Sequence, residues 1–286
     1  MPIVPEGADQ GFVETPVGKV HYVSAGSGPP LFLLHGGHGS WVHWHANLMP
    51  LANRHTVFAL DMPGFGQSAD APASGRIEDV AQSVWDTIAA LRAMLSPSLR
   101  SLPVDIAGFS FGTLVAATLA SRQPQAVRAL LLVNPPGLGE VSQEVRQVQA
   151  RAADAARIGG LRAGLEITLR ELLLCRPERA DAFALELLEH GVVNTRLVSR
   201  SLSRAARLIP LLGTLKPSVH VVLGENDPHQ RHELAARRTR LEAALGASCV
   251  SLFADASHWL QYDQPERFNE LALRVFARCD VAVHPE

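Results

Sequence analysis

The stretch that decides the fold is Val104-Asp-Ile-Ala-Gly-Phe-Ser-Phe-Gly-Thr113, in which Ser110 stands between two glycines. A largely apolar run precedes the first glycine, and residues 111–122, rich in small side chains, follow. This order predicts a strand, a sharp turn and a helix, because Gly108 and Gly112 let the two backbones approach each other. We interpret Ser110 as a nucleophile raised on that turn; an ordinary strand–helix turn that contains a serine is the alternative.

Further apolar runs of four or five residues lie on both sides of this stretch. Continuous rather than alternating apolar residues are typical of strands buried on both faces. These runs are residues 31–34, 56–60, 129–133, 219–223 and 249–253. Helical stretches alternate with them, at residues 77–95, 111–122, 229–245 and 265–277. The alternation predicts an α/β fold with a mostly parallel central sheet and helices on both faces, begun by two short antiparallel strands at residues 11–15 and 18–23.

Residues 137–213 interrupt this alternation, because they contain helical stretches and no strand pattern. The stretches are residues 142–158, 161–175, 177–191 and 194–209. We therefore predict a core of residues 1–136 and 214–286 and an inserted helical lid of residues 137–213. An insertion at this point would cover the carboxyl ends of the strands, where the chemistry of parallel sheets collects.

Composition excludes several classes of protein. Apolar residues make up 47% of the 286, which is enough for a large core, and a net charge of −2 does not favour nucleic-acid binding. The three cysteines are far apart, which indicates neither a disulfide framework nor a zinc site and favours a reducing compartment. The first eleven residues carry two acids and no apolar run, and no stretch is long and apolar enough to span a membrane. We expect a cytoplasmic enzyme.

A serine hydroxyl needs a base to become a nucleophile. His258 is the best candidate, since it follows the last predicted strand in Ala256-Ser-His-Trp259. The third member should be a carboxylate that orients the histidine. Asp227 ends the run at residues 219–223 and precedes His258 by 31 positions, so the chain order is Ser, Asp, His. Asp255 and Glu225 are its rivals, and a helix N-cap is the structural alternative for Asp227.

The remaining site residues are predicted from their neighbourhood. The backbone N–H groups of Gly37 and Phe111 are placed to stabilise an oxyanion. Substrate contacts are expected from residues that flank the predicted chemistry, namely His38, Trp41, Phe109 and Trp259. His43 and His45 could suggest metal ligands, but no carboxylate or cysteine lies at ligand spacing, so we predict no metal. No phosphate-binding or dinucleotide motif is present, and we expect no cofactor.

Four lid arginines recur at helical spacing. On a helix over residues 194–209 one face would carry Arg196, Arg200, Arg204 and Arg207. Val198, Leu202 and Ile209 would lie on the opposite face. This pattern is typical of an amphipathic helix with a solvated basic side, which we favour over substrate binding.

Five motifs together resemble the α/β-hydrolase superfamily over nearly the whole chain. They are His35-Gly-Gly37, Asp61-Met-Pro-Gly-Phe-Gly-Gln-Ser68, Gly108-Phe-Ser-Phe-Gly112, Gly224-Glu-Asn-Asp227 and His258-Trp259. The ending, His258-Trp-Leu-Gln-Tyr-Asp-Gln-Pro-Glu-Arg-Phe-Asn269, is similar to that of the meta-cleavage-product hydrolases, which hydrolyse carbon–carbon bonds in vinylogous diketones. That family has a longer glycine–proline front loop and an asparagine before the nucleophile, where this chain has Phe109.

The sequence thus predicts a hydrolase acting on a small, apolar substrate. Ester hydrolysis through a Ser110 acyl-enzyme is the leading hypothesis. Carbon–carbon hydrolysis, a cofactor-free haloperoxidase or perhydrolase activity, and a non-catalytic ligand-binding role are the alternatives. Whether the chain is a monomer or a homodimer stays open.

Overall fold

The structure, a computed structural model, describes residues 4–205 and 208–278. An eight-stranded sheet in the order β1-β2-β4-β3-β5-β6-β7-β8 forms its centre. Strand β2 pairs antiparallel with β1 and β4, and all other neighbours are parallel. The strands are β1 (Asp9–Thr15), β2 (Gly18–Ala25), β3 (Pro30–Leu34), β4 (Thr56–Leu60), β5 (Val104–Phe109), β6 (Val127–Val133), β7 (Ser218–Gly224) and β8 (Val250–Phe253).

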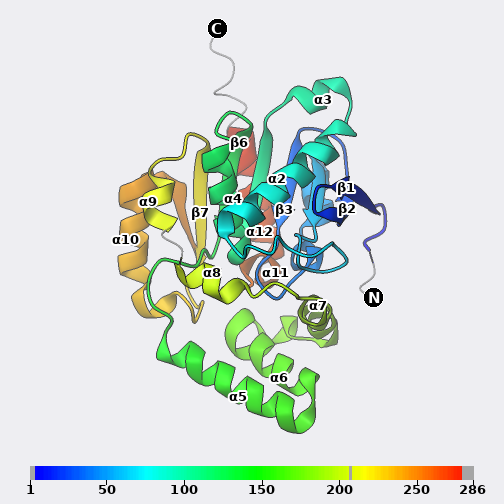
Figure 1. Cartoon of the computed structure of the whole chain (residues 1–286). Coiled ribbons are helices and arrows are strands. Elements are labelled where there is room, and N and C mark those ends of the chain that lie inside the picture. The colour runs from blue at the N-terminus through cyan, green and yellow to red at the C-terminus, as the bar shows by residue number, and fades with distance from the viewer. Residues whose placement is uncertain (1–3, 206–207, 279–286) are drawn as a thin grey trace.

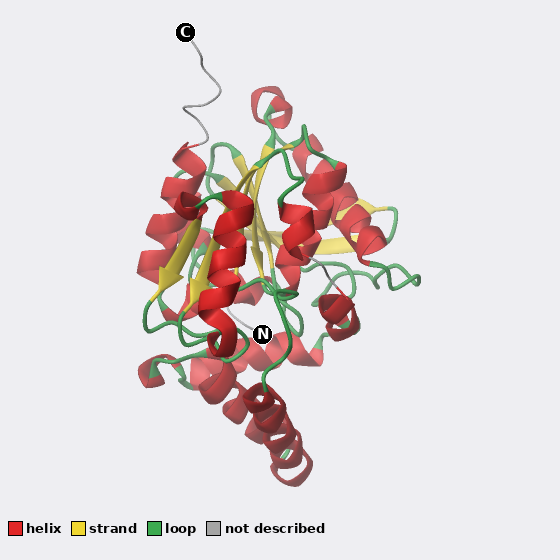
Figure 2. Cartoon of the chain, turned by 90° about the vertical axis from the view of Figure 1, so that its left-hand side faces the viewer, coloured by secondary structure: helices red, strands yellow, loops and turns green. Residues whose placement is uncertain are grey.

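Helices cover both faces of this sheet (Figures 1 and 2). Alternate residues of β3 show why both faces are apolar: Leu31 and Leu33 pack into one core cluster, Phe32 and Leu34 into the other. The first cluster is completed by α1 (Leu48–Ala52) and α12 (Pro265–Arg278), the second by α2 (Ile77–Ala93), α4 (Phe111–Arg122) and α10 (Leu234–Leu245). The α/β-hydrolase fold predicted from the sequence is confirmed.

Between β6 and β7 the described residues form helices joined by loops, and no strand. The helices are α5 (Gln143–Gly159), α6 (Leu161–Thr168), α7 (Ala182–Val193), α8 (Ser199–Ala205) and α9 (Leu208–Leu212). Figure 2 shows α5 and its neighbours below the sheet, at the end towards which the strand arrows point. The division into a core and a lid of residues 137–213 stays a prediction. No helix in the described part of the chain is long and apolar enough to cross a bilayer.

Several helix limits differ from the sequence prediction. The stretch expected at residues 161–175 changes from α-helix to a π turn at Leu169–Leu173. The stretch expected at 177–191 is a 3₁₀ turn at Pro177–Arg179 followed by α7, which begins where the Asp181 carboxylate accepts the N–H of Ala184 at 2.8 Å. The remaining small elements are η1 (Trp41–Trp44), α3 (Pro97–Ser101), the 3₁₀ turns Arg231–Glu233 and Ala247–Cys249, and α11 (Leu260–Asp263).

The helix expected at residues 194–209 is wrong in its first turn. The backbone N–H groups of Arg196 and Leu197 donate to the carbonyl of Gly64 at 2.9 and 3.1 Å, and α8 begins only at Ser199. Val198, expected on a buried face, is consequently 71% exposed. Hydrogen bonds to another part of the chain thus replace the helical ones here.

Candidate active site

Ser110 lies at the turn between β5 and α4 with φ 47° and ψ −117°. This is a left-handed conformation that costs free energy in a residue with a side chain. Its neighbours make it possible: a Cβ on Gly112 would lie 2.3 Å from the carbonyl oxygen of Leu34, and one on Gly108 would lie 2.6 Å from that of Gly112. The Ser110 N–H donates to the carbonyl of Val133 at 2.9 Å, which ties the turn to β6.

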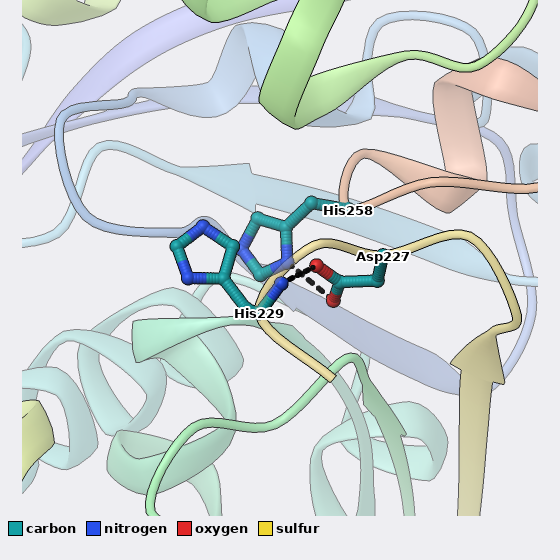
Figure 3. A group of neighbouring side chains, drawn as sticks. All are labelled: Asp227, His229 and His258. Atoms are coloured by element: carbon teal, nitrogen blue, oxygen red, sulfur yellow. Dashed lines mark hydrogen bonds and ion pairs between the residues drawn. The ribbon is translucent and has the colours of Figure 1, made fainter. Parts of the chain in front are cut away.

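A chain of hydrogen bonds runs from Ser110 through His258 to Asp227. The Ser110 Oγ lies 3.0 Å from His258 Nε2, and His258 Nδ1 lies 2.7 Å from Asp227 Oδ2. His258 comes from the loop after β8 and Asp227 from the loop after β7 (Figure 3). The two rival carboxylates, Asp255 and Glu225, are both exposed. The structure therefore brings together the three residues that the sequence singled out.

Asp227 is fully buried, and its second oxygen is also satisfied. Oδ1 accepts the backbone N–H of His229 at 2.9 Å (Figure 3). Asp227 is not a helix N-cap, because the next 3₁₀ turn begins only at Arg231 and α10 at Leu234. Burial alone would raise the pKa of Asp227, but the charge and hydrogen bond of His258 lower it below its ordinary value. The carboxylate is thus ionised near neutral pH and can hold the Nδ1 proton of the imidazole.

Two residues of this site were not found from the sequence. The ring of His229 lies against that of His258, with centroids 4.5 Å apart and planes tilted by 44°. Burial, followed by the charge of His258, lowers the pKa of His229 to about 4. Asn134 follows β6 and is fully buried; its amide donates to the carbonyls of Ser257 and His258 at 3.0 and 2.8 Å and accepts the N–H of Gly224 at 2.9 Å. It was visible in the sequence only as a polar residue at a strand end.

The front loop, residues 35–40, lies against the nucleophile turn. A Cβ on Gly37 would lie 3.8 Å from the Cβ of Phe111, so the two predicted oxyanion residues are neighbours. Both line the cavity beside Ser110. The N–H of Phe111 belongs to the first residue of α4, and such groups have no partner within their own helix. The two amides are therefore candidates to bind an oxyanion.

A cavity of about 820 Å³ opens beside Ser110 and His258. The segment between β6 and β7 supplies much of its apolar wall, including Leu165, Leu172, Leu188 and Val192. The core contributes Phe109, whose ring centroid is 5.1 Å from that of His258, and His38, which has φ 56°. Burial and then the charge of Arg200 lower the pKa of His38, which favours its neutral form.

The structure corrects the expectation for Trp41 and Trp259. Neither is among the described residues that line the cavity, and both are buried in the core. Trp259 stacks on Tyr262 at 4.3 Å, and its indole N–H donates to the carbonyl of His43 at 2.9 Å. The reason is the direction of the side chains: both follow functional loops in sequence but point into the packed interior.

The two described arginines of the four predicted on one helix face have different surroundings. Arg196 is exposed and pairs with Asp70 at 2.6 Å. Its guanidinium also donates to the carbonyls of Gly66 and Ser68. Arg200 is also exposed, but it lines the cavity, and its charge contributes to the lowered pKa of both His38 and His229. The side chains of Arg204 and Arg207 lie outside the described part of the structure. Arg200 is thus placed to meet a ligand. Arg146 and Arg237 also line the cavity, but they donate hydrogen bonds to backbone carbonyls of the chain.

One group of side chains in the described part of the chain has metal-ligand atoms close together. It consists of Asp227, His229 and His258, whose ligand atoms lie within 4.8 Å of one another (Figure 3). Both oxygens of Asp227 already accept hydrogen bonds, from His258 Nδ1 and from the N–H of His229. Because His258 Nδ1 holds the proton that Asp227 accepts and its Nε2 faces Ser110, the arrangement fits a catalytic triad better than a metal centre.

Comparison with known proteins agrees with the fold. Residues 31–271 match the alpha/beta hydrolase family. The dihydrolipoyllysine-residue acetyltransferase component of the acetoin cleaving system of Cupriavidus necator is 30% identical over 263 residues, covering 88% of this chain and 65% of that protein. The 2-hydroxy-6-oxo-6-phenylhexa-2,4-dienoate hydrolase of Comamonas testosteroni is 24% identical over 272 residues, covering 89% and 90%.

Among solved structures, a carboxylesterase from Bacillus subtilis superimposes with a TM-score of 0.76 at 20% identity, covering 96% of this chain and 93% of that one. At this identity the likeness concerns the fold. The chain spans 65%, 50% and 28% of the length of three curated relatives that it matches.

Proposed function

The chain belongs to the alpha/beta hydrolase family, and from this premise we propose that it is a serine hydrolase of carboxylic esters with an apolar acyl or aromatic group. The observation that carries the proposal is the unbroken chain of hydrogen bonds from Ser110 through His258 to Asp227, at 3.0 and 2.7 Å. The largely apolar cavity beside it supports the choice of substrate.

In this mechanism Ser110 Oγ attacks the ester carbonyl carbon while His258 Nε2 takes its proton. The carbonyl π electrons move to the oxygen, and the N–H groups of Gly37 and Phe111 stabilise the oxyanion. When the carbonyl re-forms, the bond to the alcohol breaks, and His258 gives its proton to the departing oxygen. A water molecule then repeats the sequence on the acyl-enzyme, which releases the acid and restores Ser110.

The role of Asp227 is to keep the imidazole in one tautomer. Its Oδ2 accepts the Nδ1 proton, so the lone pair of Nε2 faces Ser110. The lid of residues 137–213 would enclose the acyl group. Cys175 and Cys249 are free thiols, which fits the cytoplasmic location that we propose.

A panel of p-nitrophenyl esters of increasing acyl length tests this function. We expect turnover of these esters, and labelling by a fluorophosphonate probe that Ser110→Ala abolishes. Absence of both labelling and turnover in the folded wild-type protein would contradict the proposal and favour a ligand-binding role. Labelling without ester turnover would instead point to another substrate of the same nucleophile, with perhydrolysis as one case.

Carbon–carbon hydrolysis is a second candidate because of Arg200. A dienoate carries a carboxylate and releases a carbanion, and both call for a cation or polar groups in the cavity. Arg200 lines the cavity and has no ion-pair partner among the described residues. The similarity to the dienoate hydrolase of Comamonas testosteroni supports this candidate. The ratio of kcat/KM for a short-chain p-nitrophenyl ester to that for a meta-cleavage dienoate decides between the two; we expect it to exceed one.

A further inference from the structure

His43 lies in η1, yet its side chain reaches back to the loop that precedes it. The backbone N–H of Gly36 donates to His43 Nδ1 at 3.2 Å. Gly36 is the residue before Gly37, whose N–H is one of the two candidate oxyanion donors. Only 4% of His43 is exposed, so water competes little for this hydrogen bond.

The imidazole of His43 is held between residues adjacent to the proposed catalytic groups. Its ring centroid is 5.2 Å from that of Phe109, which precedes Ser110, and 5.2 Å from that of Trp259, which follows His258. The carbonyl of His43 also accepts the Trp259 indole N–H at 2.9 Å. His43 therefore contacts the nucleophile turn, the front loop and the histidine loop at once.

The front loop depends on contacts with other side chains for its conformation; besides the His43 contact, His35 Nδ1 donates to the carbonyl of Gly36 at 2.7 Å. Three of its six residues, 36, 37 and 39, are glycines, which lose more backbone freedom on ordering than any other residue. Two of these glycines have no room for a side chain. A Cβ on Gly36 would lie 3.0 Å from the Phe109 ring, and one on Gly39 would lie 2.1 Å from the His43 ring. An oxyanion donor works only when it is aimed to within a fraction of an ångström.

We propose that His43 is a positioning residue that holds the front loop in register with Ser110, so that the Gly37 N–H points at the oxyanion. This inference rests on the proposed serine-hydrolase function. Since Nδ1 accepts a hydrogen bond, the neutral ring carries its proton on Nε2. Burial lowers the pKa of His43 well below its ordinary value, which keeps the ring in this neutral form near pH 7.

Two nearly isosteric substitutions test the hydrogen bond itself. In His43→Asn the side-chain oxygen can replace Nδ1 as acceptor, whereas His43→Leu has a similar shape and no acceptor. We expect His43→Leu to lower kcat for the best ester by about 10²-fold, the cost of a small misplacement of a catalytic group. His43→Asn should recover most of that loss. Binding of a boronic acid, which forms a tetrahedral adduct on Ser110, should weaken in parallel with kcat, while KM changes much less.

Two controls separate positioning from damage to the fold or to the base. Thermal unfolding midpoints are measured for each variant, and His43→Gln, whose oxygen lies too far along the side chain to replace Nδ1, serves if His43→Leu does not fold. The pH profile of kcat/KM should keep its shape, because His258 and Asp227 are untouched. The inference would be overturned if kcat were equal in His43→Asn and in His43→Leu (or in His43→Gln, where it takes the place of His43→Leu). It would also be overturned if His43→Leu, or His43→Gln in its place, bound the boronic acid with wild-type affinity. Failure of wild-type Ser110 to react with a fluorophosphonate would instead overturn the proposed function.

Discussion

At the scale of single residues, the proposed chemistry depends on three side chains that act as one unit. His258 lies between Ser110 and Asp227 with both ring nitrogens engaged, at 3.0 and 2.7 Å. Neither outer residue has a role without the imidazole, since one gives it a proton and the other orients it. The side-chain amide of Asn134 donates to the backbone carbonyl of this histidine and so holds its loop in place. The losses of activity caused by substitutions at Ser110, His258 and Asp227 should therefore not be additive.

The triad predicts a non-additive pattern of rates. Ser110→Ala and His258→Ala should each remove nearly all ester turnover, and the double variant should be little worse than either. Asp227→Asn should lower kcat by about 10⁴-fold, because the imidazole would be held in the wrong tautomer. The measurement is steady-state turnover of a p-nitrophenyl ester by folded variants. If Asp227→Asn kept most of the activity, another carboxylate would have to orient His258.

At the scale of elements, the short helix α8 places Arg200, and not Arg196, at the cavity. Its start at Ser199 follows from the hydrogen bonds of Arg196 and Leu197 to Gly64. Arg196 consequently stays on the surface with Asp70, while Arg200, in the first turn of α8, lines the cavity. The two arginines are four positions apart, and only Arg200 lines the cavity. Substitution of Arg196 can therefore serve as the control for substitution of Arg200.

Arg200 predicts a preference for substrates that carry a carboxylate. Arg200→Gln should lower kcat/KM for a dienoate or for a monoester of a dicarboxylic acid by about tenfold, the lower end for a charged hydrogen bond, because Arg200 is exposed. Turnover of a neutral p-nitrophenyl ester should change little. Arg196→Gln removes the same charge away from the cavity and should affect neither substrate. Equal effects of Arg200→Gln on charged and neutral substrates would exclude direct pairing with the carboxylate.

At the scale of the whole molecule, folding buries histidines that cannot take up a proton. His35 is fully buried, and its Nε2 accepts the N–H of Met62 at 3.1 Å while Nδ1 donates to the carbonyl of Gly36 at 2.7 Å. Burial lowers the pKa of His35 to about 4 from its ordinary 6.5. The unfolded chain therefore binds a proton at this residue in a pH range in which the folded chain does not.

This difference predicts acid sensitivity of the fold. The free energy of unfolding should be largest above pH 6.5 and should fall as the pH decreases towards 4, with His35 contributing about 3 kcal/mol of that fall. Urea unfolding between pH 7 and 4 measures it. In His35→Gln, which retains an acceptor for Met62 but cannot be protonated, the fall should be smaller by a similar amount, even if stability at pH 7 is lower. If the pH dependence of the free energy of unfolding were unchanged in His35→Gln, His35 would not be a source of the acid sensitivity.

Much of the fold follows from local pattern. The strand predicted at residues 56–60 agrees with β4 at both ends, and the helix predicted at residues 111–122 agrees with α4. Continuous apolar runs are rare outside strands buried on both faces, so they locate the sheet without tertiary information. Since parallel strands end at one edge, the residues after three of those runs, Ser110, Asp227 and His258, were expected together, and the structure brings them within hydrogen-bond distance.

The side chains that surround the triad could be identified only from the tertiary structure. Periodicity assigns a side chain to a face of its own element, but it does not say what that face meets. Trp41 and Trp259 were expected at the cavity and lie in the core, whereas Arg200 was expected in solvent and also lines the cavity. His43 is tied to Gly36 across seven residues, and Asn134 to His258 across 124. The sequence by itself therefore determined the sheet and the order of the triad, because strand burial and chain order are local properties. Only the packing of distant loops decided which side chains position the triad and line its cavity.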